Sequence, residues 1–228
     1  MDEGKWALRM KTVVYAGTRN LYESMRVAVT SLLANNRIDR VFLLIEDDVF
    51  PYQMPDNVRT INVSNQTIFP PTGVNYKTRW TYMTMMRCAL TKVLPHNKKV
   101  LWLDCDTIVD GDISDLFKTD LTGAYYAGVT EPGKSKDRLY INAGVLLINL
   151  AEIKKDGLDD RLIDVLNNRP FSFPDQDAIN LLAQGKIKPL ESKYNVCPFT
   201  EQTETKIIYH FAANVYYCTE RMYLKYRG

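Results

Sequence analysis

The sequence predicts a single α/β domain, spanning residues 1–228, with a mostly parallel central sheet and helices on both of its faces. Continuous apolar runs of strand length alternate along the chain with segments of helical periodicity. No repeat, low-complexity tract or linker interrupts that alternation, and 228 residues suffice for one ample core. With 46% hydrophobic and 25% charged residues, the composition is that of a globular protein rather than a disordered or fibrous one.

Strands are expected at the apolar, β-rich runs, and helices where apolar residues recur every three or four positions. The strands expected in chain order are 12–16, 41–45, 58–63, 100–103, 125–129, 143–148, 187–190 and 207–211. Tyr22, Met25, Val29 and Leu32 form the stripe of the first helix. Further helices are expected over 82–93, 158–167 and 177–183, the first of these ending near Pro95 because the residue before a proline disfavours helix.

The net charge and the N-terminal sequence limit the classes of binding partner and the expected location of the protein. The 29 Lys and Arg against 27 Asp and Glu leave a formal charge of only +2, so no global field favours nucleic acid or an anionic membrane. Residues 1–5 lack the layout of a signal peptide, and the apolar runs are too short to form a transmembrane segment. A cytoplasmic protein is therefore expected.

The cysteines give no sign of a disulfide or zinc framework. Cys88, Cys105, Cys197 and Cys218 show no Cys-x-x-Cys spacing, and the chain has only two histidines. Free thiols are expected.

Two carboxylates directly follow the apolar run 100–103. Asp104 and Asp106 project to the same side if the backbone there is extended. Like charges repel at short range unless a cation lies between them, so the pair is typical of a divalent-metal site with diphosphate oxygens as further ligands. Two solvated aspartates in a turn are the alternative.

The surrounding segment 101–117, Leu-Trp-Leu-Asp-Cys-Asp-Thr-Ile-Val-Asp-Gly-Asp-Ile-Ser-Asp-Leu-Phe, resembles the donor-metal segment of the retaining family-eight glycosyltransferases. These are glycogenin-like proteins and bacterial galactosyl- and glucosyltransferase relatives, with a GT-A fold. The resemblance, which runs from about Thr12 to Phe211, implies a metal-dependent transfer of a hexose from a UDP-sugar donor to a glycan, lipid-linked or protein acceptor. It also implies that Asp104, Cys105 and Asp106 contact the donor. Asp112 is interpreted separately, as a helix cap before Ile113.

Two further segments carry the resemblance on the sugar side. Residues 140–150 look like the family's Asn-Ala-Gly-Val segment, which implies that Asn142 faces the sugar and that Gly144 lies against the donor. Close backbone packing is the alternative for Gly144. Asp175 and Gln176 are similar to the family's Asp-Gln segment, which lines the transferred sugar, and are the catalytic candidates together with Asn142. Capping of the following helix is the alternative for Asp175.

On the nucleotide side, segment 15–22 resembles the family's uridine-binding turn. The resemblance implies that Ala16 and Thr18 contact base and ribose and that Tyr22 stacks on the uracil. Arg87 lies eight residues before Pro95, the spacing of a family arginine that contacts the donor. On a continuous helix it would face away from the apolar stripe, free to reach a diphosphate; a solvated arginine is the alternative.

Segment 207–211 matches the strand that delivers the family's histidine metal ligand, here His210. An imidazole beside two carboxylates suits Mn²⁺, with Mg²⁺ as the alternative ion. The family's following Gly and Lys are missing, since residues 212–217 read Ala-Ala-Asn-Val-Tyr-Tyr. Arg221 and Lys225, four residues apart, are the candidates to replace that lysine.

Two other functions stay open. Residues 16–19 superficially resemble the Gly-rich loop of sugar nucleotidyltransferases, although its additional glycines are missing. The missing Gly and Lys would also fit a catalytically inactive relative that binds nucleotide sugars or carbohydrates. UDP-glucose and UDP-galactose are the first donors to test, and the sequence does not identify the acceptor.

Overall fold

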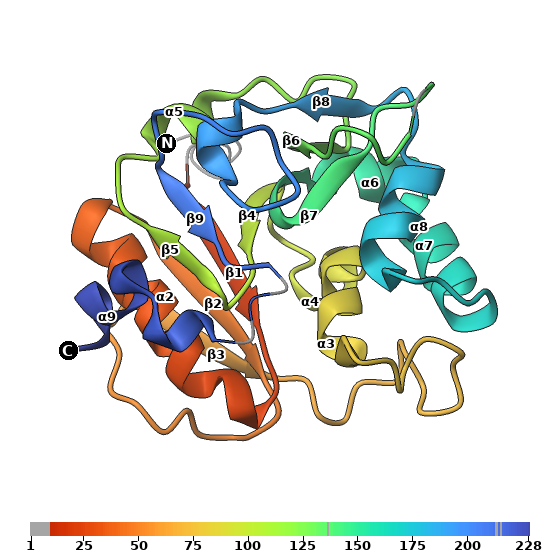
Figure 1. Ribbon diagram of the computed structural model, residues 1–228. Coiled ribbons are helices and arrows are strands. Elements are labelled where there is room, and N and C mark those ends of the chain that lie inside the picture. The colour runs from red at the N-terminus through yellow and green to blue at the C-terminus, as the bar shows by residue number, and fades with distance from the viewer. Residues whose placement is uncertain (1–9, 136, 213, 215) are drawn as a thin grey trace, which may run out of the picture.

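A computed structural model of the chain describes residues 10–135, 137–212, 214 and 216–228. Its centre is a seven-stranded sheet, with the two-stranded antiparallel sheet of β5 (Thr107–Val109) and β9 (Ile208–His210) beside it (Figure 1). In spatial order the central strands are β3 (Val58–Asn62), β2 (Arg40–Ile45), β1 (Thr12–Ala16), β4 (Lys99–Leu103), β7 (Ile141–Asn149), β6 (Tyr126–Thr130) and β8 (Ile187–Pro189). Strand β7 runs opposite to its neighbours β4 and β6, and the other pairings in this sheet are parallel. The predicted mostly parallel sheet is therefore confirmed.

Helices cover both faces of this sheet, as predicted, because side chains alternate between the faces along each buried strand. Val13 and Tyr15 pack with α2 (Tyr22–Asn35) and α5 (Ser114–Lys118), whereas Val14 packs on the opposite side. The opposite side carries α3 (Thr81–Met85), α4 (Leu90–Val93), α6 (Leu150–Lys155), α7 (Leu158–Asn168) and α8 (Pro174–Leu182). The C-terminal α9 (Arg221–Arg227) packs against α2 and β5.

Each expected strand is present with slightly different bounds, but two helices differ from the prediction. The helix expected over 82–93 is divided into α3, the 3₁₀ turn η2 (Met86–Cys88) and α4. Helix α8 begins at Pro174, which suits the first helical turn because that position needs no backbone N–H. Short 3₁₀ turns also occur at η1 (Arg19–Leu21), η3 (Ser192–Tyr194) and η4 (Tyr217–Thr219). Asp112 Oδ1 accepts a hydrogen bond from the Ser114 backbone N–H (2.8 Å), but the N-cap of α5 is Ile113, so Asp112 lies one residue before the cap position that was predicted for it.

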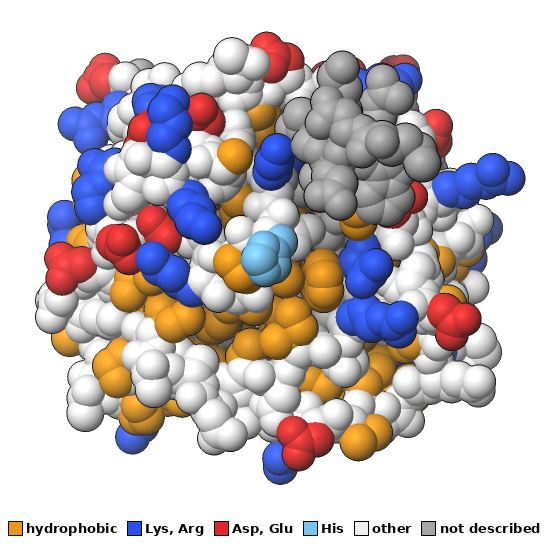
Figure 2. Space-filling view, turned by 180° about the vertical axis from the view of Figure 1, so that it is seen from behind, with side chains coloured by type: hydrophobic (Ala, Val, Ile, Leu, Met, Phe, Trp, Pro, Cys, Tyr) orange, Lys and Arg blue, Asp and Glu red, His pale blue; other side chains and the backbone are white. Residues whose placement is uncertain are grey.

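Figure 2 shows the reverse face of the molecule, on which basic and acidic side chains are interspersed around a strip of hydrophobic ones. Among the side chains that are coloured by type on that face, the basic ones form no single large patch. In the part of the chain that the structure describes, no helix has the length and apolar character needed to cross a bilayer. Residues 1–5, on which the leader prediction depends, lie outside the described residues.

Candidate active site

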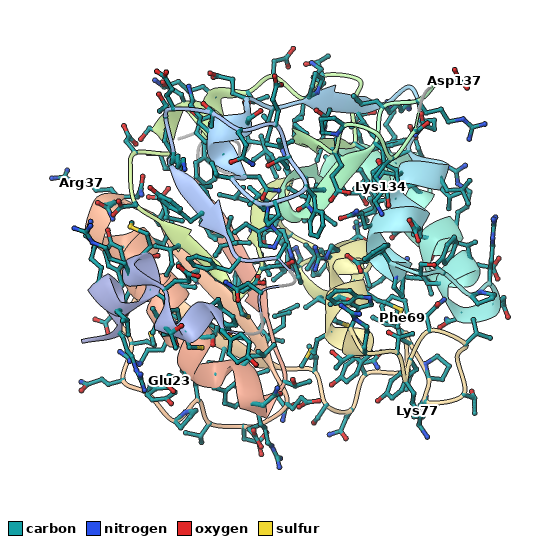
Figure 3. The ribbon with its side chains drawn as sticks, viewed as in Figure 1. Glu23, Arg37, Phe69, Lys77, Lys134 and Asp137 are labelled. Carbon is teal, nitrogen blue, oxygen red and sulfur yellow. The ribbon has the colours of Figure 1, made fainter. Side chains whose placement is uncertain are left out.

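Polar side chains gather at the edge of the sheet where β4 and β6 end and β7 begins. Asp104 and Asp106 follow β4, Glu131 follows β6, and Asn142 lies at the start of β7. Because β7 is antiparallel, its first residues reach the same edge as the carboxyl ends of its neighbours. These side chains line a pocket of about 260 Å³, which α8, β9 and the segment before α3 also border. Figure 3 draws the described side chains on the ribbon, with Lys134 labelled. Ligands of open α/β sheets bind at this edge, so the pocket is the candidate active site.

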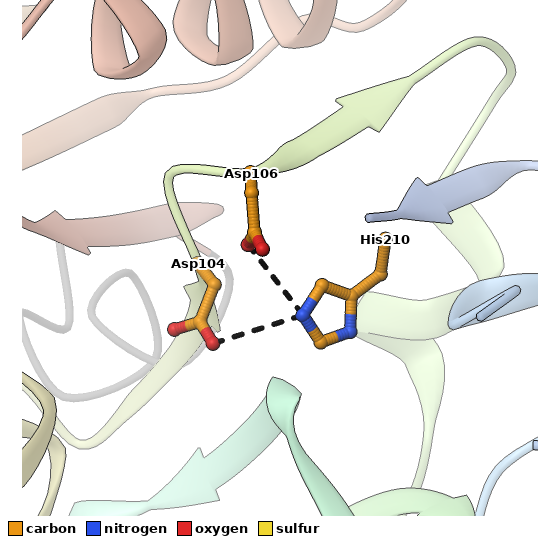
Figure 4. Close-up of side chains that lie close together, drawn as sticks. All are labelled: Asp104, Asp106 and His210. Carbon is orange, nitrogen blue, oxygen red and sulfur yellow. Dashed lines mark ion pairs between the residues drawn. The ribbon is translucent and has the colours of Figure 1, made fainter. Parts of the chain in front are cut away.

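Asp104, Asp106 and His210 come together at this pocket (Figure 4). His210 Nε2 lies 3.5 Å from Asp106 Oδ1 and 3.9 Å from Asp104 Oδ2, and the three ligand atoms lie within 4.8 Å of one another. Cation–oxygen distances near 2.3 Å put the ligand atoms of one ion about 3–4.5 Å apart, so the spacing fits a single divalent cation. Strand β5 creates the cluster, because its Thr107 pairs with His210 and brings the imidazole beside Asp106.

A chain of hydrogen bonds turns the imidazole toward the carboxylates. The Gly144 backbone N–H donates to Asn142 Oδ1 (2.9 Å), so Asn195 must present its Nδ2 to that same oxygen, at 2.8 Å. Asn195 Oδ1 is thereby directed at His210 Nδ1, 2.9 Å away, and accepts its N–H. His210 Nε2 is left facing the carboxylates, as a metal ligand requires.

Gly144 also provides the space for the imidazole. A Cβ at this position would lie 2.1 Å from His210 Cε1 and 2.6 Å from each ring nitrogen. No side chain fits there while the ring keeps its place. The packing interpretation of Gly144 therefore has a direct structural cause, and contact with a donor remains compatible because the residue lines the pocket.

Asp104 is oriented from its other side. Trp102 Nε1 and Arg87 Nη2 both donate to Asp104 Oδ1, at 2.9 and 2.7 Å, which leaves Oδ2 on the side of the histidine. The two carboxylate oxygens therefore have separate roles, one for protein donors and one for a cation.

The prediction of a surface-facing Arg87 is wrong in this structure. The residue is 3% exposed, lies in the 3₁₀ turn η2, and pairs through Nε with Asp175 Oδ2 (3.0 Å) as well as with Asp104. Its Nη1 donates to the carbonyl oxygen of Ala143. A guanidinium with these partners positions two acidic side chains and is not solvated. Arg87 still lines the pocket, so its contact with a donor remains a prediction.

The site concentrates negative charge in a buried setting. Burial acts to lower the pKa of His210, but Asp106 and a hydrogen bond with Cys197 outweigh it, and the pKa rises to about 9. Burial raises the pKa of Asp104 and of Asp175, although the neighbouring guanidinium opposes that rise. Carboxylates in such a place need a balancing positive charge, which a divalent cation would provide.

Glu131 connects the sugar-side candidates and was not predicted. Its Oε1 accepts from Asn142 Nδ2 (2.6 Å) and lies 3.3 Å from Gln176 Nε2. The Gln176 amide also lies 3.3 Å from the Tyr140 hydroxyl oxygen and accepts from the Ala143 backbone N–H at 2.9 Å. The available signal was its position, a carboxylate directly after the apolar strand 126–130.

Asp175 does not cap α8, contrary to the alternative interpretation. Asp177 Oδ2 instead accepts from the Phe173 backbone N–H (2.9 Å), while Asp175 is 6% exposed and paired with Arg87. Asp175 therefore lines the pocket as part of a buried ion-pair network.

The stacking role predicted for Tyr22 is contradicted. Its side chain is 5% exposed, and its ring packs against Phe50 with centroids 5.3 Å apart. The hydroxyl donates to Asp47 Oδ2 (2.9 Å) and accepts from the Glu46 backbone N–H (2.8 Å). Tyr22 thus fixes the end of β2 and has no ring face available to a base.

The other nucleotide-side candidates lie at the end of β1, beside the carboxylates but outside the lining of the pocket. Ala16 and Thr18 are half-buried, and Thr18 Oγ1 donates to Asn20 Oδ1 at 2.5 Å. Cys105 is buried with Sγ 3.2 Å from the Ala16 carbonyl oxygen, and burial raises the pKa of its thiol. Its side chain therefore faces β1, and only its backbone could meet a donor. All four cysteines are free, as predicted.

The C-terminal cations do not reach the metal cluster. Lys225 Nζ pairs with Asp110 Oδ1 at 2.5 Å, and Asp110 lies beyond the far end of β5, about 13 Å from Asp106 along an extended chain. Arg221 is exposed on α9 and does not line the pocket. Lys225 is therefore excluded as the replacement for the missing lysine. Residues 213 and 215, in the segment 212–217 where the family's Gly and Lys are missing, lie outside the described residues.

The fold is that of the GT-A glycosyltransferases. The structure resembles that of the galactosyltransferase LgtC, solved with donor and acceptor sugar analogues, at a TM-score of 0.66 and 21% identity, covering 89% of this chain and 87% of that one. The chain matches the sequence profile of glycosyl transferase family 8 over residues 12–219 and belongs to that family. The predicted family, fold and enzyme class are confirmed.

Two relatives show how much of each chain the sequence similarity covers. Glycosyltransferase GlyA of Streptococcus pneumoniae is 29% identical over 201 residues, 81% of this chain and 28% of that protein. The lipopolysaccharide 1,2-glucosyltransferase of Escherichia coli is 28% identical over 222 residues, 85% of this chain and 64% of that protein. The chain therefore spans less than two thirds of either relative.

Proposed function

We propose that this glycosyltransferase binds a UDP-sugar through Mn²⁺ held by Asp104, Asp106 and His210, and transfers its hexose with retention to a carbohydrate acceptor. The supporting observation is the cluster itself, two carboxylates and an imidazole within 4.8 Å beside a pocket lined by Asn142 and Gln176. The imidazole ligand favours Mn²⁺ over Mg²⁺, which prefers oxygen ligands. Four free thiols suit a reducing compartment, so we place the activity in the cytoplasm.

In the proposed reaction an acceptor hydroxyl oxygen forms a bond to the anomeric carbon as the bond from that carbon to the diphosphate oxygen breaks. The bonding electrons leave with the diphosphate, which also receives the hydroxyl proton. A divalent cation, when bound, supplies the positive charge that stabilises the departing diphosphate. Asp104, Asp106 and His210 hold the ion, and Asn195 keeps the imidazole turned toward it.

The sugar-side residues are proposed to position the hexose. Gln176 has its amide oxygen on the Ala143 backbone N–H and its Nε2 near Glu131 and Tyr140. An amide held in this way is suited to orient hydroxyls rather than to attack the anomeric carbon. This favours attack by the acceptor from the side of the leaving group. Asn142 and Gln176 would line the sugar, and Asp175 would hold Arg87 in place through their ion pair.

The donor sugar is proposed from the relatives. A glucosyltransferase and a galactosyltransferase are among the similar proteins, so UDP-glucose and UDP-galactose are the first candidates. Family membership argues against a sugar nucleotidyltransferase, whose product would be pyrophosphate.

A screen of UDP-sugars tests the proposal. The protein is incubated with each donor in Mn²⁺, Mg²⁺ or a chelator, and free UDP is measured. A parallel incubation supplies UTP and a sugar 1-phosphate, the substrates of a nucleotidyltransferase, and pyrophosphate is measured. We expect Mn²⁺-dependent release of UDP from at least one UDP-hexose. Release of pyrophosphate would establish the nucleotidyltransferase alternative, and release of neither product would establish the inactive relative.

A further inference from the structure

The outer part of the pocket is an aromatic and cationic rim, made of Arg79, Trp80, Lys134, Phe173 and Phe199. Phe173 and Phe199 are 37% and 45% exposed, unlike the buried residues deeper in the pocket. The rings of Trp80 and Phe173 lie 5.8 Å apart at 37° to each other. Trp80 Nε1 donates to the Ser172 carbonyl oxygen at 3.2 Å, so separate loops are tied together at the rim.

Both rim cations lie over rim rings. Arg79 Cζ is 4.2 Å from the centroid of the Trp80 ring, and Lys134 Nζ is 4.3 Å from that of Phe173; Lys134 is labelled beside α8 in Figure 3. Within the described ranges, neither cation pairs with a carboxylate. The face of an aromatic ring holds a cationic side chain in place, while the N–H groups of that cation stay available to an anion.

The backbone next to the rim is also specialised. Thr81, which follows Trp80 and begins α3, has a φ of 60°, and no other described non-glycine residue has a positive φ. This conformation costs a β-branched residue free energy, and such costs concentrate at binding sites. The chain therefore maintains the turn that carries Arg79 and Trp80 despite a local penalty.

The rim lies on the acceptor side of the proposed reaction. In the sheet, β1 with its nucleotide-side residues lies on one flank of β4, whereas β7 and β6 lie on the other. The rim residues come from the β6–β7 loop and from the segments before α3, α8 and β9. A donor that runs from β1 to the carboxylates would place its hexose in the pocket, and an acceptor would enter over the rim.

We propose, resting on the function proposed above, that the acceptor is an anionic saccharide. Its sugar ring packs on Trp80 and Phe173, and its phosphate or carboxylate group binds Arg79 and Lys134. The rings provide apolar faces for a pyranose and the cations provide charge-assisted hydrogen bonds. A neutral acceptor would use the rings and leave the cations unmatched.

Matched acceptors test this inference. The methyl glycosides of glucose and galactose, their 6-phosphates and the corresponding uronates are compared as acceptors, and transfer is followed by product mass. The parent should show a KM about tenfold lower for anionic than for neutral acceptors, since each exposed ion pair contributes up to about fivefold. The double variant Arg79→Ala/Lys134→Ala should lose that preference, and Arg79→Lys/Lys134→Arg should keep most of it. Comparison of the phosphate and uronate arms identifies the anionic group.

Controls separate the rim from the donor site. Lys154→Ala removes an exposed cation at the end of α6 and should behave as the parent. UDP affinity in Mn²⁺ should be unchanged in the double alanine variant. Equal KM values for neutral and anionic acceptors in the parent would overturn the inference. So would a loss of UDP affinity in that variant, which would assign the cations to the donor diphosphate. A parent that releases no UDP from any donor would instead contradict the proposed function.

Discussion

Gly144→Ala is expected to disable the metal cluster through one methyl group. The added Cβ would lie 2.1 Å from His210 Cε1, whereas ordinary contact begins at 3.4 Å, so the ring would have to retreat by about 1.3 Å. Metal ligands tolerate about 0.2 Å, so Nε2 would leave the coordination sphere. We expect Mn²⁺ affinity to fall by about 100-fold, the upper end of the effect of losing ligand orientation.

Titration calorimetry with Mn²⁺ and UDP measures this loss, and thermal unfolding measures the accompanying strain. Gly111→Ala is the matched control, because its Cβ would meet its nearest neighbour, Ile207, at an ordinary 3.5 Å. The double variant Gly144→Ala/His210→Ala should unfold at a higher temperature than Gly144→Ala alone, since the methyl group then has space. A Gly144→Ala protein that binds Mn²⁺ as tightly as the parent, or a double variant without recovered stability, would refute the steric argument.

Three further variants probe the groups around the cluster. Asn195→Leu removes the acceptor for His210 Nδ1–H and should weaken Mn²⁺ binding about tenfold in calorimetry. Asn195→Asp keeps that acceptor but loses the Nδ2 donor to Asn142 Oδ1, and should lose less affinity than Asn195→Leu; equal losses would contradict an orienting role. Arg87→Met removes the cation that pairs with the buried Asp175 and the half-buried Asp104, and should lower the free energy of unfolding in urea by about 3 kcal/mol; an unchanged value would show that the ion pairs contribute little. Glu131→Gln should leave Mn²⁺-dependent UDP binding intact but slow UDP release from the donor, and a parallel loss of both would place Glu131 in the metal cluster.

Site residues could be predicted from the sequence where a local pattern, such as an apolar strand followed by carboxylates, is enough to identify them. Asp104 and Asp106 follow an apolar strand directly, and that position marked them as candidates. The extended backbone expected between them is instead a turn, in which the Thr107 backbone N–H donates to the Asp104 carbonyl oxygen at 3.1 Å. The partner His210 came from resemblance, and the structure supplies the physical link. The pairing of β5 with β9 joins segments about 100 residues apart, and no periodicity within either segment indicates it.

Two predicted placements, an accessible Tyr22 ring and an exposed Arg87, are wrong because packing overrides what a short segment indicates. Tyr22 belongs to the same apolar stripe that predicts α2, and a residue on that stripe faces the core, so stacking on a base conflicted with the helix prediction. Arg87 was assigned to the exposed side of a continuous helix. The 3₁₀ turn at Met86–Cys88 changes the direction of its side chain and buries it between two carboxylates.

Asn195 and Glu131 were not predicted, and the structure shows their contacts with residues that are distant in the sequence. Asn195 lies in an irregular segment after η3, and nothing in its neighbourhood distinguishes it from a polar loop residue. Its importance arises because Asn142 and His210 converge on it from β7 and β9. Glu131 could have been found from its place directly after an apolar strand, since ligands bind at the carboxyl ends of such strands.

The most direct test of the proposed metal site is calorimetry of UDP binding with and without Mn²⁺ in the parent and in Asp106→Asn. The substitution keeps the size of the side chain and removes one of the two carboxylates of the cluster. We expect Mn²⁺ to strengthen UDP binding to the parent by at least about tenfold and to have almost no effect on Asp106→Asn, because a cation needs the charged oxygen. An unchanged Mn²⁺ dependence in Asp106→Asn would show that the ion binds elsewhere and would contradict the assignment of Asp104, Asp106 and His210 as the donor-metal site.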